Sequence, residues 1–572
     1  MHPVDFVSHL RELAARRPDD TAVIAVTDRD GTAIDTPVSY RRLDTRVRGL
    51  AARLQQSFGR GERALIMLDN SDDYVVSFFA CLYAGLIAVP VFPPESTRKR
   101  HLAKLEGIAA DAGACCVLTH AAIQASIAGV AGAFTDVPLI CVDEIGAEDA
   151  GRWTPHTPAP TDIAFLQYTS GSTSAPKGVM VTHANLMANM RAIEEGLSVG
   201  PDDIFASWLP LNHDMGLIGG LLQPLHRGIP VALMSPRYFL ERPVRWLETV
   251  SRHRATISGG PDFAYRLCLD RVSKAQLQKL DLSSWGLAFS GAEPVRADTL
   301  RDFRKQFAPA GFAAAALYPC YGLAESTLFV TGGQRGAGMV AHDFSSQALA
   351  RGIVELEAET GATLVGCGRS VSGHAVRIVD PASLAVRDAG AVGEIWATGP
   401  SIGSGYWNKP EVSRQTFVEC DGATWLRTGD LGFIHDGQLY VAGRIKDMII
   451  VRGHNLYPQD IERMIELEVD IVRKGRVAAF AVSGPGAEGI GVAAEVSRST
   501  QKLVKPEALV EVLSAAVSEQ FGEPLSVVML LNPGGMPKTT SGKLQRGACR
   551  QGWLDRSADA YAMYAHGEFV LG

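Results

Sequence analysis

Two polar segments set a lysine among glycine, serine and threonine, which are residue types that bind phosphate. The first, YTSGSTSAPKGV, spans residues 168–179, and the second, PKTTSGKLQR, spans residues 537–546. In the first segment glycines let the backbone approach a ligand closely, hydroxyl and N–H groups can bind an anion, and Lys177 adds positive charge. It is not a Walker A loop, because Pro176 precedes the lysine where that motif has glycine. Both segments are therefore candidates for phosphate contact.

Short apolar runs lead into several of these polar segments. DIAFLQYTS (162–170) enters the first lysine segment, and ATISGGP (255–261) and LAFSGAEP (287–294) repeat a strand-then-glycine pattern. Such runs, alternating with helical stretches, are typical of buried parallel strands in an α/β architecture, with ligands beyond the strand ends. We expect an α/β fold with a large N-terminal body of sheets flanked by helices.

One apolar stretch, residues 74–92, has no charge and nearly the length of a membrane span. Residues 70–73 before it have the polar and acidic types of a helix N-terminus, and Gly85 is typical of a helix end. Residues 86–91 then resemble a buried strand. We therefore predict a helix followed by a strand, and no membrane span.

After GRIKDMIIVRGHNLYP the pattern of predicted strands and helices changes. The segments 476–484 and 489–497 have the pattern of pairing strands, and 525–532 of a further strand. Residues 505–522 predict a helix with Pro506 in its first turn and Gly522 as its stop. We expect a small α+β C-terminal domain at 446–572, after a body at 1–445.

The amino-acid composition argues against a disordered chain and against a general nucleic-acid-binding protein. The chain has 572 residues, 46% hydrophobic and 20% charged, which is typical of a globular protein. The net charge of −7 argues against a general nucleic-acid binder. Nine cysteines occur without metal-ligand spacing, and we interpret them as reduced thiols of a cytoplasmic protein.

Six motifs occur in an order that resembles the adenylate-forming superfamily of acyl-CoA synthetases, peptide-synthetase adenylation domains and firefly-type luciferases. They are YTSGSTSAPKGVMVTH, LAFSGAEP, YPCYGLAES, WLRTGDLG, VAGRIKDMII and PKTTSGK. Within it, LPLNHDMGLIGGLLQPLHRG, SGGPDFAYRLC and YGLAESTLFVTGG are most similar to fatty acyl-AMP ligases. The resemblance implies ATP and Mg²⁺ as cofactors, a fatty acid as substrate, and an acyl carrier protein with a phosphopantetheine arm as partner.

The resemblance also implies residue roles. Catalysis would involve Lys543, Glu325 as the Mg²⁺ ligand, and His213 beside the acyl carboxylate. Nucleotide would be bound by Thr169, Ser170, Gly171, Ser172, Thr173, Lys177, Gly178, Gly291, Ala292, Tyr321, Gly322, Asp430 and Arg444. Lys446 would be the hinge of a mobile C-terminal domain that brings Lys543 to the phosphate loop and later removes it, so that the two lysine segments are halves of one site.

Some roles have an ordinary alternative. His213, Met215 and Phe263 would contact the acyl substrate. A lone histidine is otherwise more often a hydrogen-bonded core residue, and core packing explains Met215 and Phe263 equally well. Asp262 departs from the asparagine expected in GGPDFAY, which affects pocket detail and not the reaction type.

The reaction implied is activation of a fatty acid to acyl-adenylate and transfer to a carrier protein, with a fatty acyl-CoA synthetase as the alternative. An amino-acid-activating domain and an inactive nucleotide binder are further rivals. Residues of about 332–364 resemble the ligase-specific insertion, which would disfavour the arrangement that uses CoA. In it, Leu349 and Ile353 have helical spacing, and Val354 and Leu356 alternate as in a strand.

Overall fold

The computed structural model describes residues 5–94, 99–128, 134, 137–169, 176–357, 361–451, 454–469, 471–484, 487–539, 542–565 and 567–571. Ser170, Gly171, Ser172 and Thr173 of the predicted phosphate loop lie outside these residues. The chain forms two compact units. The first unit contains residues 1–340, 367–376 and 396–428, and the second contains 341–366, 377–395 and 429–572. The predicted division into 1–445 and 446–572 is a different partition and stays a prediction.

The first unit contains a six-stranded sheet, and its strands β7 and β8 lead into and out of the predicted phosphate loop. Its strand order is β6-β5-β3-β4-β7-β8, parallel except where β8 runs antiparallel to β7. The strands are β3 (Arg63–Met67), β4 (Ile87–Val91), β5 (Ala114–Thr119), β6 (Leu139–Cys141), β7 (Ile163–Thr169) and β8 (Lys177–Thr182). The accompanying helices are α1 (Phe6–Arg16), α2 (Tyr40–Ser57), α3 (Asp72–Ala84), α4 (Lys99–Ala112) and α5 (Ala121–Ala128).

The apolar stretch 74–92 is a helix followed by a strand, as predicted. Ser71 is the N-cap of α3, and its Oγ accepts a hydrogen bond from Tyr74 N at 3.2 Å. Gly85 ends the helix with a left-handed φ of 78°, which glycine adopts without strain. Over the described residues, no helix combines the length and apolar character that a membrane crossing needs.

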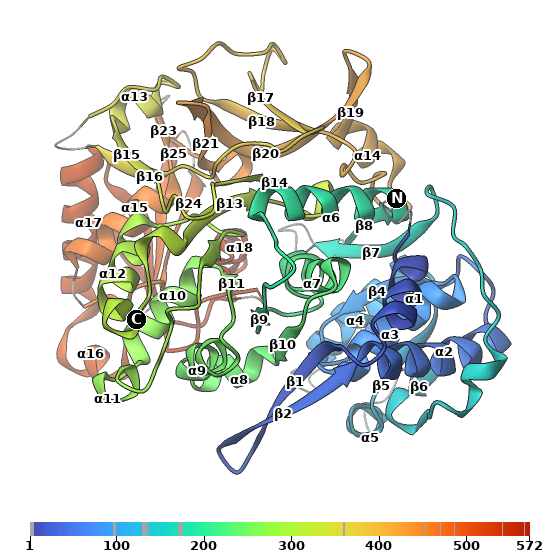
Figure 1. The fold of residues 1–572 in the computed structure, drawn as a ribbon. Helices are drawn as coiled ribbons and strands as arrows, with labels where there is room; N and C mark the ends of the chain where they lie inside the picture. The colour runs from blue at the N-terminus through green and yellow to red at the C-terminus, as the bar shows by residue number, and fades with distance from the viewer. Residues whose placement is uncertain are drawn as a thin grey trace. The chain divides into compact units, whose positions relative to one another are not determined.

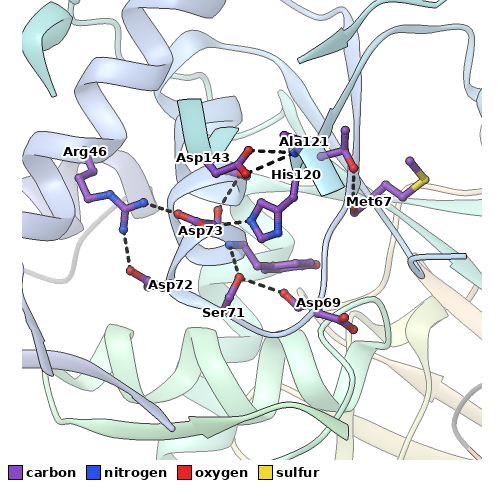
Figure 2. A network of polar contacts seen from close by, with 12 residues as sticks. Arg46, Met67, Asp69, Ser71, Asp72, Asp73, His120, Ala121 and Asp143 are labelled. Atoms are coloured by element: carbon purple, nitrogen blue, oxygen red, sulfur yellow. Dashed lines mark hydrogen bonds and ion pairs between the residues drawn. The ribbon is translucent and has the colours of Figure 1, made fainter. Parts of the chain in front are cut away.

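Polar side chains gather where β3, β5 and β6 reach their carboxyl ends (Figure 2). His120 Nε2 lies 2.9 Å from Asp73 Oδ2, and Arg46 contacts both Asp73 and Asp72. Asp143 accepts a hydrogen bond from the backbone N–H at the start of α5. These contacts join the first turns of α3 and α5 to α2, so they stabilise this edge of the sheet.

An eight-stranded sheet forms the rest of the first unit's core. Its order is β14-β13-β12-β11-β9-β10-β1-β2, with parallel pairing from β13 to β1 and antiparallel pairs at the two ends. The strands are β1 (Thr21–Arg29), β2 (Thr32–Ser39), β9 (Phe205–Ser207), β10 (Val231–Met234), β11 (Ile257–Gly260), β12 (Leu287–Ser290), β13 (Leu317–Gly322) and β14 (Phe329–Gly332). Strands β11 and β12 are the two predicted strand-then-glycine segments, which confirms the expected α/β class.

Helices lie between many of these strands in the chain order. They are α6 (His183–Leu197), α7 (Gln223–Arg227), α8 (Pro236–Glu241), α9 (Val244–His253), α10 (Asp262–Arg271), α11 (Lys274–Leu277) and α12 (Ala297–Phe307). Residues 215–222 form a π-helix (Met215–Leu222). Figure 1 shows β1 and β2 extending as a long two-stranded hairpin away from these helices.

A long strand, β20 (Ala423–His435), passes from the first unit into the second. In the first unit residues 423–426 pair with β19 (Phe417–Cys420), which follows α14 (Pro410–Thr416). In the second unit residues 430–435 pair with β21 (Gln438–Arg444). Strands β17 (Ala375–Val379) and β18 (Gly393–Thr398) precede them in the chain.

The second unit contains the predicted α+β fold. Its main sheet has the order β24-β25-β26-β27-β28, formed by Val477–Gly484, Ala487–Glu495, Leu525–Leu531, Ala560–Ala565 and Glu568–Leu571. The predicted helix is α17 (Pro506–Phe521), which ends at Gly522 with a φ of 70°. The other elements are β22 (Ile449–Val451), β23 (His454–Leu456), α15 (Pro458–Glu468), α16 (Arg498–Leu503) and α18 (Arg546–Leu554).

From residue 341 on, the predicted insertion belongs to the second unit. Strands β15 (Ala341–Phe344) and β16 (Ala362–Val365) pair antiparallel, and α13 (Ser346–Ala350) lies between them in the chain. The expected helical continuation to Ile353 is wrong: α13 ends at Ala350, and Ile353 is 43% exposed. Phe344 and Leu349 are buried in one cluster with residues of β20 and β21, so the segment packs as expected.

Candidate functional site

Glu325 lies in a tight turn of the first unit, between β13 and β14. Two residues later, Thr327 has φ 62° and ψ −61°, and Leu328 N donates to Ser326 O at 2.7 Å. This is a γ-turn with positive φ, which is rare and strained for a β-branched residue. Such backbone conformations cost about 1–3 kcal/mol and occur preferentially at functional sites. Thr327 is fully buried, and its Oγ1 donates to Ser401 O at 2.7 Å.

Residues 401–407, which we call the strap, hold this turn against β8. Gly403 N donates to Glu325 O at 2.8 Å. A side chain at Gly403 would meet Val179 Cγ1 at 2.9 Å, so glycine permits the close approach. Three backbone hydrogen bonds of 2.8–2.9 Å join the strap to β8: Ser404 N to Met180 O, Met180 N to Gly405 O, and Trp407 N to Gly178 O. The strap therefore lies alongside β8 and pairs with it in antiparallel fashion.

Tyr406 of the strap links two predicted functional residues. Its Oη donates a hydrogen bond to Glu325 Oε1 at 2.7 Å. Lys177 Nζ, at the start of β8, lies 5.5 Å from the centroid of the Tyr406 ring, which is a cation–π distance. Tyr406 is only 6% exposed. The predicted metal-binding carboxylate and the predicted phosphate-binding lysine thus contact one buried side chain.

Glu325 is suited to binding Mg²⁺ with help from a nucleotide. Mg²⁺ is usually held by one or two carboxylates together with substrate phosphates and waters. In the described parts of the chain, His, Cys, Asp and Glu do not form a group of three or more that would hold a metal alone. A single oriented carboxylate near a lysine fits the first arrangement.

His213 precedes the π-helix Met215–Leu222, which contains the predicted acyl-binding Met215. The backbone of His213 bonds at both ends, to Pro210 O at 3.1 Å and from Leu217 N at 2.9 Å. Gln167 of β7 donates to the neighbouring Asn212 O at 2.8 Å. Single π-helical turns occur often at functional sites, so the His213–Met215 region keeps its candidacy.

The predicted acyl and adenine segments meet at Glu293. Its Oε1 accepts a hydrogen bond from Phe263 N at 2.7 Å. Glu293 follows Gly291 and Ala292, and a side chain at Gly291 would come within 2.8 Å of Cys320 O. Gly291 therefore lies against the strand that carries Tyr321 and Gly322. The structure brings these predicted nucleotide residues and Phe263 into one region of the first unit.

The carboxylate of Asp262 is hydrogen-bonded to residues at the N-terminus of helix α12. It accepts hydrogen bonds from Arg296 N and Thr299 Oγ1, each at 3.0 Å. Burial, followed by the nearby Glu293 carboxylate, raises the pKa of Asp262 to about 7. Asp262 therefore joins α10 to the N-terminus of α12.

Thr169 ends β7 in the first unit, and the second unit holds the predicted ribose-binding, hinge and C-terminal lysine residues. Asp430 and Arg444 are opposite each other on β20 and β21, and Arg444 Nε donates to Asp430 Oδ1 at 2.7 Å. Lys446 lies in the following 3₁₀ turn, Ile445–Asp447. The predicted ribose-binding pair and the predicted hinge are consecutive parts of one hairpin and turn.

Lys543 lies in a tight hairpin of the second unit. Thr539 N donates to Lys543 O at 2.8 Å, and Lys543 N donates to Thr539 Oγ1 at 3.0 Å. Gln545 N donates to Pro537 O at 3.0 Å and closes the base of the hairpin. The main chain at Lys543 is therefore fixed by local hydrogen bonds.

Arg546 connects this hairpin to the predicted hinge turn. It binds Glu462 through two nitrogens, at 2.7 and 2.8 Å, and its third nitrogen lies 3.4 Å from Asp447 Oδ2. Glu462 is only 2% exposed, so this is a buried ion pair with bidentate geometry. Asp447 is the neighbour of Lys446. The Lys543 hairpin and the turn at Lys446 thus share one ionic cluster.

Three residues important to this geometry were missed by sequence reasoning: Tyr406, Glu293 and Arg546. The two glycines in GSGYW around Tyr406 are a signal of close backbone approach, and Arg546 stands within the second lysine segment. Glu293 had no separate signal, because an acidic residue before proline is typical of an ordinary turn.

The fold is that of an adenylate-forming enzyme. The chain belongs to the AMP-binding enzyme family, whose model matches residues 10–407. It is 41% identical to the medium-chain-fatty-acid–acyl-carrier-protein ligase JamA of Moorena producens over 538 residues, 92% of this chain and 91% of that protein.

Solved structures agree. A structure from a study of fatty acyl-adenylate ligases of E. coli and L. pneumophila has a TM-score of 0.87 and 33% identity, covering 97% of this chain and 98% of its own. The L. pneumophila fatty acyl-adenylate ligase in complex with acyl adenylate and pyrophosphate has a TM-score of 0.76 and 36% identity, covering 98% of each chain. These relatives confirm the resemblance to fatty acyl-AMP ligases.

Proposed function

We propose that this chain is an ATP-dependent fatty acid–AMP ligase that forms acyl-adenylate and pyrophosphate, then passes the acyl group to the phosphopantetheine thiol of an acyl carrier protein and releases AMP. The observation that carries the proposal is the meeting of Glu325 and Lys177 at Tyr406. A carboxylate for a metal–nucleotide complex and a lysine for phosphate are what nucleotidyl transfer requires. The named activities of the similar ligases support the acyl substrate and the carrier protein.

The chemistry joins an anion to a polyanion. The fatty carboxylate attacks the α-phosphorus of ATP, the bond to the β-phosphate oxygen breaks, and pyrophosphate leaves. Mg²⁺ held by Glu325 would supply charge neutralisation at the phosphates. Lys177, with the loop Thr169–Gly178, would hold the departing pyrophosphate. Lys543 would contact the carboxylate and the α-phosphate, so positioning and electrostatics provide most of the catalysis.

The remaining nucleotide contacts follow the motifs. Asp430 and Arg444 would bind the ribose, and their mutual hydrogen bond orients both side chains. Tyr321 and Gly322, with Gly291 and Ala292, would form the adenine pocket. His213, Met215 and Phe263 would contact the acyl substrate.

Asp262 argues against activation of amino acids. Such a domain needs an acid to pair with the substrate's α-amino group, and in the segment GGPDFAY the acid present is Asp262. Both of its oxygens instead accept hydrogen bonds from α12. A fatty acid, which carries no ammonium group, fits this arrangement better.

The insertion supports a carrier protein as acceptor, with free CoA as the alternative. Asn455 Nδ2, nine residues after Lys446 in the chain, donates to Ala350 O of α13 at 3.3 Å. The insertion therefore contacts the part of the chain that follows the predicted hinge. We infer that this contact disfavours the rotation of a mobile 446–572 domain to the arrangement that uses CoA. Reduced thiols and the net charge support a cytoplasmic location without nucleic acid as partner.

ATP–pyrophosphate exchange tests the first step. A panel of fatty acids of different chain length should support exchange, and amino acids should not. The adenylate should then acylate a carrier protein bearing its phosphopantetheine arm and give little acyl-CoA. Efficient acyl-CoA formation would instead favour the synthetase, and nucleotide binding without exchange would favour an inactive binder.

A further inference from the structure

We propose that Tyr406 is a positioning residue that holds the Glu325 carboxylate in its metal-binding orientation and holds Lys177 beside it. The inference rests on the proposed function, because it assigns a partner to the residues that would bind Mg²⁺ and pyrophosphate. Tyr406 acts through these two side chains and has no assigned contact with substrate.

Glu325 is restrained at both ends of its side chain. At the backbone, Gly403 N bonds to its carbonyl oxygen, and the γ-turn at Thr327 is anchored to Ser401. At the carboxylate, Tyr406 Oη bonds to Oε1 at 2.7 Å. All three anchors come from the strap. A carboxylate with one oxygen held by a buried donor keeps the other in a defined direction, as outer partners do for metal ligands.

Tyr406 is itself firmly placed. It is 6% exposed, forms a β-bridge with Val179, and its N–H donates to Ser413 Oγ at 2.8 Å. Its ring packs edge-on against Phe417 at 5.5 Å. Because its neighbours fix the ring, the hydroxyl can orient Glu325 before any ligand binds.

The ring and the hydroxyl have separable effects. The hydroxyl contacts Glu325, while the ring lies 5.5 Å from Lys177 Nζ. Tyr406→Phe removes only the hydroxyl, and Tyr406→Leu removes the hydroxyl and the aromatic face. The metal contact and the lysine contact can therefore be tested in turn.

The first measurement is Mn²⁺ binding by electron paramagnetic resonance in the presence of a non-hydrolysable ATP analogue. Tyr406→Phe should weaken Mn²⁺ binding about tenfold, as expected for loss of a hydrogen bond to a charged group. In pyrophosphate exchange, the apparent KM for Mg²⁺ should rise by a similar factor, while kcat at saturating Mg²⁺ stays within about twofold.

The second measurement is the affinity for pyrophosphate, from inhibition of adenylate formation. Tyr406→Phe should keep it, and Tyr406→Leu should weaken it several-fold because Lys177 loses its aromatic partner. Tyr83→Phe is the matched control: Tyr83 Oη donates to Asp44 Oδ1 at 3.0 Å between α3 and α2, and its removal should change neither quantity.

A double-mutant cycle decides whether the hydroxyl acts through Glu325. In a Glu325→Gln background, Tyr406→Phe should produce no further loss of Mn²⁺ binding. Equal Mn²⁺ affinity of wild type and Tyr406→Phe, or an equal loss in both backgrounds, would overturn the inference. Wild-type protein without exchange activity for any fatty acid would instead count against the proposed function, so the two failures are distinguishable.

Discussion

Lys543 has a main chain fixed by hydrogen bonds and a long, flexible side chain. This combination suits a residue whose charge contacts the bond that forms between the fatty carboxylate and the α-phosphorus. Lys543→Ala should reduce acyl-adenylate formation by about a hundredfold to a thousandfold, the effect of removing one transition-state charge contact. Its hairpin is closed by backbone bonds, so the fold should be kept. Single-turnover formation of adenylate measures the rate, and calorimetry with an ATP analogue should give nearly wild-type binding. Near wild-type rates would remove Lys543 from the catalytic set.

Asp262 should make stability depend on pH. Burial, followed by Glu293, raises the pKa of Asp262 to about 7, above the value of about 3.9 for an unfolded chain. Between these values the folded protein keeps a proton that the unfolded chain releases. The free energy of unfolding therefore falls as pH rises through this window, by at most about 1.4 kcal/mol per pH unit.

Asp262→Asn, which introduces the residue expected from the related ligases, should remove this dependence. Relative to wild type, the variant should gain stability from pH 5 to pH 8 in thermal unfolding. Asp302→Asn alters the same charge at an exposed position of α12 and serves as control. A constant difference between wild type and Asp262→Asn at the two pH values would contradict the assignment.

At the scale of elements, local signals in the sequence identified helices and strands well. Ser71 and Gly85 bound α3, and Pro506 and Gly522 bound α17, because caps act on their own neighbours. The end of α13 was missed because Ile353 has the right spacing, yet Gly352 has a φ of 78° and ends the helix.

In the candidate site, too, residues within motifs could be predicted from the sequence, whereas contacts between distant segments could not. Lys177, Glu325 and Asp430 stand in motifs and could be chosen from sequence. The hydrogen bond between Tyr406 and Glu325 joins residues 81 positions apart, and no local pattern encodes such a pair. Contacts of this kind arise from tertiary packing, which the spacing of residues in a segment does not determine.

His120, where the strands of the six-stranded sheet reach their carboxyl ends, should make the stability of the protein depend on pH (Figure 2). The hydrogen bond to Asp73 raises the pKa of His120. This contribution is complete below about pH 6.5, the unfolded histidine value, and is lost as pH rises through the higher folded value. His120→Gln should destabilise the protein at pH 6 by up to about 1 kcal/mol, because the pair is partly solvated.

The difference in unfolding free energy between His120→Gln and wild type should shrink as pH rises through the raised pKa of His120 in the folded protein. Urea unfolding at pH 6 and pH 9 measures it. His435→Gln is a control, since His435 is a partly exposed histidine of the second unit. A loss of equal size at both pH values would mean that His120 acts through packing alone.

At the scale of the whole molecule, the insertion should decide the acceptor. Leu349→Ala weakens the packing of α13, and Asn455→Ala removes its hydrogen bond to Ala350. The combined variant should adenylate a fatty acid at the wild-type rate and produce several-fold more acyl-CoA, since one arrangement loses a specific contact. Product ratios by mass spectrometry provide the measurement. An unchanged ratio in a folded variant would assign the choice of acceptor to another part of the chain.

The ionic cluster of Arg546, Glu462 and Asp447 constrains how this protein can be recombined with its relatives. Removing Arg546 or Glu462 leaves the other charge without its bidentate partner, which costs about 3–5 kcal/mol in buried pairs. A chimera that exchanges the Lys543 hairpin together with α18, but keeps residues 447–462, would place a foreign residue 546 against the original carboxylates. Functional exchange should therefore require grafting the whole stretch from residue 447 to residue 546 as one cassette.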